Sequence, residues 1–168
     1  WSFDVEEFHE HLDDGSDLEA IMRGQLYLEH VLLELLREAL PRFERLNISR
    51  MPFSTKVDLC DALGVLHPSL PAAFKKVNAL CNAVAHNLSF EMTARHKSEL
   101  FDSFPVMGQN LILDKLDGDE GIALDAATVH RMIKTAIILA DYARHDHVER
   151  KRRRDEAIEN AKRVLARD

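Results

Sequence analysis

The helical pattern that stands out most in this chain is SDLEAIMRGQLYLEHVLLELLREAL, residues 16–40. Ser16 or Asp17 can cap its start, and Glu19 in the first turn suits the positive end of a helix dipole. Apolar residues recur along it at helical spacing, at Leu18, Ile21, Leu28, Val31, Leu32, Leu35, Leu36 and Ala39. The pattern predicts one long amphipathic helix that buries this stripe.

Two further features of the stretch bear on how the helix packs. Leu26 and Leu33 add a second apolar face, so the helix is expected to lie at the centre of the fold. Gly24 interrupts the main stripe, and its missing side chain predicts either a bend or the close approach of another helix.

Shorter helical patterns fill most of the remaining chain. They are expected at residues 3–12, at 54–62, from Pro68–Pro71 to about His86–Asn87, at 93–104 and within 105–123, with Ser54 and Thr93 as caps. An acidic loop, Asp117 to Glu120, leads to a last helix that is expected to begin at Asp125 and to run into the charged residues 144–168. Together these patterns predict an all-α protein: a single bundle of five or six helices over residues 1–143, continued by a charged helical extension over 144–168.

Composition agrees with this fold class and limits the function. Gly and Pro are scarce, at 6 and 5, and runs of β-branched residues are nearly absent, which disfavours strands. The formal net charge is −7, but residues 1–143 hold 13 Lys/Arg against 23 Asp/Glu (−10), whereas residues 144–168 hold 9 against 6 (+3). An acidic body disfavours broad contact with the phosphate backbone of nucleic acids.

The sequence also bears on location and on cofactors. It contains no apolar run long enough to cross a membrane and begins with an acidic segment unlike a signal peptide, so a cytoplasmic protein is expected. Cys60 and Cys81 lie on apolar helix faces and are expected to be buried thiols in a reducing compartment. Nothing resembles a phosphate loop, a dinucleotide turn or a zinc motif, so no cofactor and no metal are expected.

The segment Val77–Leu88, VNALCNAVAHNL, is the candidate site. Asn78, Asn82 and His86 are spaced one turn apart and therefore share one helix face, within an otherwise apolar stripe. Such polar groups either satisfy one another or face a cleft or a partner. Two interpretations stay open: a buried network at the helix end, and an active site or dimer seam.

Several runs in the same part of the chain resemble bacterial HEPN-like proteins, which are small helical bundles. Residues 77–87, VNALCNAVAHN, are similar to the pattern I-N-K-L-R-N-x-x-A-H-N of that group. Residues 53–57, FSTKV, and 62–64, ALG, resemble its F-x-x-K and A-L-G stretches, which mannitol-repressor-like proteins share. Arg23-Gly24 followed by Leu28-Glu29 resembles the first long helix, so the likeness covers about residues 16–100.

This resemblance implies a bacterial homodimer that pairs through the helices carrying the Asn/His motif. Ribonucleolytic HEPN proteins carry an Arg four to six residues before the His, and here those positions hold Cys81, Leu80 and Ala79. The Tyr that toxin members place two residues after the His is Leu88. Without a cation to stabilise phosphate charge, ribonuclease activity is disfavoured.

The function we expect is therefore a non-catalytic interaction or regulatory module, associated with transcription regulation as mannitol-repressor-like proteins are. The alternative is a HEPN-type ribonuclease, or the inactive partner in a toxin–antitoxin or defence pair. In the nuclease, His86 and Asn82 would be catalytic and Arg23 would replace the missing cation. A DNA-binding repressor is disfavoured because no helix-turn-helix pattern is present.

Other charged residues have simpler interpretations. Arg23 and Lys56 are expected to form structural salt bridges. His9 and His11, like His145 and His147, are two residues apart and point to opposite sides of a helix, so neither pair can chelate one metal ion. The basic run at residues 150–154 is interleaved with acids and is expected to be a solvated face. A small apolar stripe follows it, at Ile158, Ala161, Val164 and Leu165. The stripe suggests that the tail helix packs against another surface, such as a second subunit.

Overall fold

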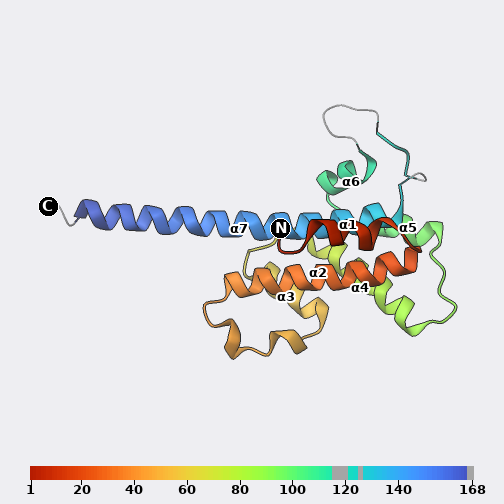
Figure 1. Cartoon of the computed structure of the whole chain (residues 1–168), viewed down its shortest axis with the longest axis horizontal. Helices are drawn as coiled ribbons and strands as arrows, with labels where there is room; N and C mark the ends of the chain where they lie inside the picture. Colours follow the sequence, from red (N-terminus) through yellow and green to blue (C-terminus); the bar gives the residue numbers. More distant parts are fainter. Residues whose placement is uncertain (115–120, 125–126, 166–168) are drawn as a thin grey trace.

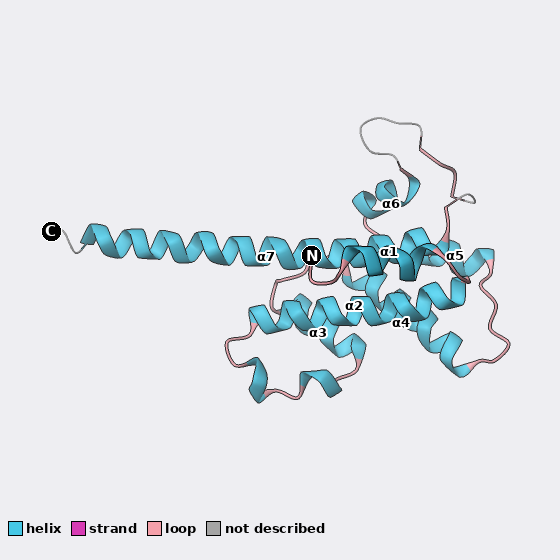
Figure 2. Cartoon of the chain, in the orientation of Figure 1, coloured by secondary structure: helices cyan, strands magenta, loops and turns pink. Residues whose placement is uncertain are grey.

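A computed structural model of the chain describes residues 1–114, 121–124 and 127–165. Every regular element in this part of the chain is helical, which confirms the all-α prediction (Figure 2). The α-helices are α1 (Val5–Asp13), α2 (Asp17–Ala39), α3 (Phe53–Ala62), α4 (Pro71–His86), α5 (Ala94–Asp102), α6 (Val106–Leu113) and α7 (Val129–Leu165). Two 3-10 turns, η1 (Phe43–Arg45) and η2 (Ile48–Arg50), connect α2 to α3.

The described residues contain seven α-helices, rather than the expected five or six. The short helices α1 and α6 form where helical patterns were expected, at residues 3–12 and within 105–123, and each is a separate element. The side chain of Asp4 caps α1 by accepting hydrogen bonds from the backbone N–H groups of Glu6 and Glu7, at 2.9 and 3.0 Å. α6 follows Pro105 and ends at Leu113, and its C-cap residue Asp114 has a left-handed φ of 60°.

Two of the expected caps are present. Ser16 and Glu19 form a capping box at the start of α2: the Ser16 hydroxyl accepts from the Glu19 N–H at 3.3 Å, and the Glu19 carboxylate accepts from the Ser16 N–H at 2.8 Å. The hydroxyl of Thr93 caps α5 by accepting from the N–H of His96 at 3.3 Å. These local bonds satisfy backbone donors that would otherwise have no helical partner.

The other two helix starts differ from expectation or lie outside the described residues. The predicted cap at Ser54 is wrong, because α3 begins at Phe53 and Pro52 stands at the N-cap position. The predicted cap Asp125 and the acidic loop Asp117 to Glu120 lie outside the described residues. α7 begins at Val129, preceded by Thr128, whose hydroxyl accepts from the N–H of Arg131 at 3.1 Å.

The core forms where α2 lies against α7, the most extensive helix contact in the described chain (Figure 1). α1 and α4 also pack on α2, and α6 packs on α7. Gly24 is buried at the crossing of α2 and α7, where an added Cβ would lie 2.0 Å from Cγ2 of Ile133. Close approach, rather than a bend, therefore explains the glycine: α2 continues through it.

The outer part of α7 leaves the other helices and extends away from them (Figure 1). Residues 151–164 are all exposed, including Ile158 and Val164 of the apolar stripe; the side chain of Leu165 lies outside the described set. Side chains one helical turn apart form ion pairs along this part of α7. Arg152 lies 2.9 Å from the carboxylate of Glu149 and 2.7 Å from that of Glu156. No described segment covers the apolar stripe.

None of the described helices combines the length and the apolar character that crossing a bilayer requires.

Candidate functional site

The three polar residues of the sequence motif lie on one surface of α4, and they do not form a network with one another. Asn78 is half-buried, and its side-chain oxygen accepts a hydrogen bond from the amide of Gln25 on α2 at 3.3 Å. Asn82 and His86 are exposed, and neither makes a hydrogen bond or ion pair within the described residues. A buried network at the helix end is therefore not what the structure contains. The motif faces outward.

Exposed apolar side chains of α2 lie beside this row. Met22 and Leu26 are one turn apart on α2 and are 41% and 68% exposed. The Sγ of Cys81 on α4 lies 3.6 Å from the Sδ of Met22, so the two helices share one continuous surface here. We name this surface the α2–α4 face; its members are Met22, Leu26, Asn78, Cys81, Asn82 and His86.

The thiol of Cys81 is half-buried on this face, unlike the fully buried Cys60. Burial, with a smaller contribution from the nearby carboxylate of Glu29, raises the pKa of Cys81. A raised pKa keeps sulfur in the thiol form, which is a poor nucleophile. Cys81 thus contributes packing surface rather than chemistry.

Glu29 extends from the α2–α4 face toward α3, where it pairs with Lys56. The Lys56 side chain is completely buried, and its ammonium forms an ion pair with Glu29 and a 3.4 Å hydrogen bond to the carbonyl of Ser49. The expected structural salt bridge is confirmed for Lys56. It joins α2 to α3 behind the candidate site.

Arg23 lies on the other side of α2, toward α1. Its guanidinium donates to the backbone carbonyl of His11 at 3.0 Å, so the salt bridge expected for Arg23 is replaced by a hydrogen bond to the main chain. It lines a shallow groove with Tyr27, whose hydroxyl is 2.8 Å from the His11 ring, and with His30; Leu26 lies at the border between this groove and the α2–α4 face. No hydrogen bond or ion pair within the described residues joins Arg23 to His86.

The chemistry open to the α2–α4 face follows from these positions. Apart from the titratable imidazole of His86, none of its six side chains carries a charge at neutral pH. Cleavage of RNA needs a cation near the reacting phosphate, and the two lysines of α4 are already engaged: Lys75 with Asp58, and Lys76 with Glu99 at 2.6 Å. The face is suited to apolar and amide contacts with another protein surface.

The histidines of the first pair, His9 and His11, have partners other than a metal. The His9 ring lies 3.2 Å from the carboxylate of Asp13, and His11 contacts Tyr27. The described residues contain no group of three or more His, Cys, Asp or Glu side chains placed to hold a metal ion.

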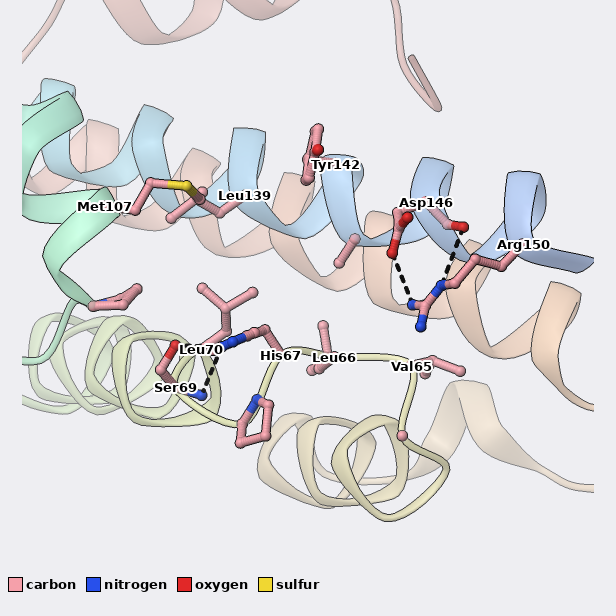
Figure 3. A pocket seen from close by; sticks show the side chains of 14 residues that line it. Val65, Leu66, His67, Ser69, Leu70, Met107, Leu139, Tyr142, Asp146 and Arg150 are labelled. Atoms are coloured by element: carbon pink, nitrogen blue, oxygen red, sulfur yellow. Dashed lines mark hydrogen bonds and ion pairs between the residues drawn. The ribbon is translucent and has the colours of Figure 1, made fainter. Parts of the chain in front are cut away.

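One concave site lies outside the residues that the sequence patterns singled out. The connection between α3 and α4, the start of α6 and the middle of α7 enclose a cavity of about 440 Å³, lined by Val65, Leu70, Met107, Leu139 and Tyr142 among others (Figure 3). Only three-dimensional packing brings these distant segments together. The sequence holds one weak indication of this site: Met107 and Tyr142 are large apolar side chains at positions where the helical pattern predicts polar ones.

Comparison with protein families, with curated proteins and with solved structures gave no significant match. The function proposed next therefore rests on the residues and on the geometry described above.

Proposed function

We propose that this protein is a non-catalytic interaction module that forms a homodimer through the α2–α4 face. The observation that carries the proposal is the contact between the exposed Met22 of α2 and Cys81 of α4, with the exposed Leu26 one turn further along α2. Exposed apolar side chains next to amides are typical of the buried centre of protein interfaces, from which charged side chains are depleted. The HEPN-like resemblance supports the same face, because its members pair through the helix with the Asn/His motif.

A twofold interface would also give partners to side chains that lack them. Asn82 is exposed and makes no hydrogen bond within the described residues, so its amide is open to a second copy. In a symmetric interface each amide on this face meets the same surface of the second copy. Amide donors from the partner can then satisfy acceptors on this face.

The thiol of Cys81 provides a built-in reporter for this proposal. At protein concentrations that favour the dimer, its reaction with a maleimide should slow, because the second copy covers it; Leu26→Glu should restore the fast rate at every concentration. Cys60 is buried and reacts only on unfolding, which gives an internal reference. A Cys81 rate that is independent of concentration in the wild type would contradict pairing through this face.

The alternative is a HEPN-type ribonuclease, or the inactive partner of one, and it predicts a different result. Wild-type protein and His86→Ala are each incubated with a mixed pool of single-stranded RNA. An interaction module leaves the pool intact in both samples. Cleavage by the wild type that His86→Ala abolishes would establish the nuclease and overturn the proposal.

The functional context belongs to the same proposal. We infer a bacterial, cytoplasmic protein associated with transcription regulation that acts through a partner protein rather than through direct contact with DNA. The acidic charge of residues 1–143 (−10) supports a protein partner over a nucleic acid. Affinity for DNA that falls steeply with salt would contradict this.

A further inference from the structure

The cavity beside α7 continues into a second groove of opposite character. The cavity of about 440 Å³ is bounded by Val65, Leu70, Met107 and Leu139, with Tyr142 at its rim. A smaller groove of about 200 Å³ adjoins it along the same helix and shares Gly64, Val65 and Arg150 with the first. We name the two together the α7 groove. It has no residue in common with the α2–α4 face.

The two ends of the α7 groove differ in charge. Arg150, Lys151 and Arg154 line the second end, where Leu63 and Val65 form the opposite wall. Asp146 lies between the two ends and pairs with Arg150 at 2.8 Å (Figure 3). The Lys151 ammonium donates to the backbone carbonyl of Glu38 at 3.1 Å, so no carboxylate neutralises it there. The carboxylate nearest to Arg154 is that of Asp155, at 3.8 Å.

His147 also lines this end, beside the carboxylate of Glu38, which acts against the lowering of its pKa. Burial and the neighbouring Arg150 lower the pKa of His147, so its ring is neutral at pH 7. The groove therefore runs from an apolar pocket to a cationic end along one helix.

Exposed apolar side chains at the first end indicate that the ligand is large. Tyr142 is 66% exposed and Met107 is 54% exposed. Such side chains beside a pocket are typical of protein recognition surfaces, where Tyr and Met are enriched. From Leu139 to Arg154 the helix rises about 22 Å, which matches about seven residues of extended peptide.

We propose that the α7 groove binds an acidic peptide segment of a partner protein, with an apolar side chain in the cavity and carboxylates at Arg150, Lys151 and Arg154. This inference deepens the proposed interaction role by adding a second surface and the chemistry of its partner. The tail of a second copy is the wrong occupant, because residues 151–164 hold six Lys/Arg against three Asp/Glu and would be repelled. A nucleic acid would leave the apolar end unfilled.

The probe is a fluorescein-labelled ten-residue peptide with two Leu/Phe anchors followed by four Glu, titrated with the full chain by fluorescence anisotropy. The matched control peptide carries Lys in place of each Glu. We expect the acidic peptide to bind at least tenfold more tightly than the basic one, and its affinity to fall as salt is raised. Equal binding of the two peptides, or no binding of the acidic one by folded protein, overturns the proposal.

Variants locate the binding. Arg154→Glu and Tyr142→Ala, each confirmed as folded by circular dichroism, should weaken binding about tenfold; Met107→Ala gives a second test of the apolar end. The controls are Arg153→Glu, on the same helix but outside the groove, and Val106→Ala, next to Met107 but not lining the cavity. Both should bind within about twofold of the wild type. Loss of binding in the controls equal to that in the groove variants overturns the assignment to this groove.

The outcome for the groove is separate from the outcome for the α2–α4 face. Leu26→Glu should abolish the dimer and leave peptide binding intact. Tyr142→Ala should weaken peptide binding and leave the dimer intact. A peptide that fails to bind a chain still forming the dimer therefore overturns the groove alone.

Discussion

The side chain of Lys56 is completely buried, and its charge is compensated by the carboxylate of Glu29. The Glu29 side chain is 32% exposed. Removal of one partner of such a pair leaves a buried charge without its counterion, whereas replacement of the buried cation by an apolar side chain of similar volume also removes the desolvation cost. We expect Glu29→Ala to lower the free energy of unfolding by about 3 kcal/mol and Lys56→Met by less than half of that. Urea unfolding of the two variants measures both values. Equal losses would contradict a desolvation-dominated pair.

Gly24 allows α2 and α7 to touch, and the structure leaves no space for a methyl group there. Gly24→Ala should lower the free energy of unfolding by about 2 kcal/mol, because the helices must separate or Ile133 must leave its rotamer. In the double variant with Ile133→Ala the clash disappears. The combined loss should therefore be smaller than the sum of the two single losses. If the two single losses of unfolding free energy, measured by thermal or urea unfolding, add up to the loss in the double variant, then Gly24 is not there to make room for Ile133.

Glu99 links α4 to α5 by accepting from Lys76 at 2.6 Å and from Arg95 at 2.7 Å, and these bonds lower its pKa to about 2. The pKa of Glu99 is lower in the folded chain than in the unfolded chain. Its contribution to the free energy of unfolding is therefore present above pH 4.5 and is lost as the pH falls toward 2. The wild type should be more stable than Glu99→Gln at pH 6, and the difference should shrink toward pH 2. Asp61→Asn is the control, because the Asp61 side chain forms no ion pair within the described residues. Its stability difference from the wild type should not shrink in the same way toward pH 2.

At the scale of elements, the outer part of α7 contributes little to the stability of the other helices. The described side chains that a chain ending at Arg154 lacks, those of residues 155–164, are all exposed, so its melting temperature should stay within about 2 °C of the full chain. A chain that stops after Ala143 also loses Arg144, which lies 2.8 Å from Glu38 and 3.0 Å from Asp141, and should melt distinctly lower. Circular dichroism melting compares the two. Strong destabilisation by the first truncation would show that the tail folds back.

Periodicity and capping residues predicted most helices of this fold. The stripe of residues 16–40 and the Ser16/Glu19 pair placed α2 correctly, because both signals are local. The start of α3 was misplaced, since Ser54 is a good capping residue but Pro52 already fixes the chain for a helix start.

At the scale of the whole molecule, the site was predicted only in part. The spacing of Asn78, Asn82 and His86 correctly placed them on one surface, because helix geometry alone determines it. The contribution of Met22 and Leu26 depends on how α2 lies against α4, and no local pattern encodes that. The same reason hides the α7 groove, which is built from three separate segments.

Sedimentation equilibrium over a range of protein concentrations shows whether the α2–α4 face joins two copies of this chain. The wild-type mass should approach about 38 kDa, twice the 19.2 kDa of one chain, and Leu26→Glu should give a mass near 19 kDa. Leu46→Glu changes a side chain that is 46% exposed but lies outside the face, and it should behave as the wild type. A monomeric wild type at every concentration, or a dimer that Leu26→Glu leaves intact, would contradict the account.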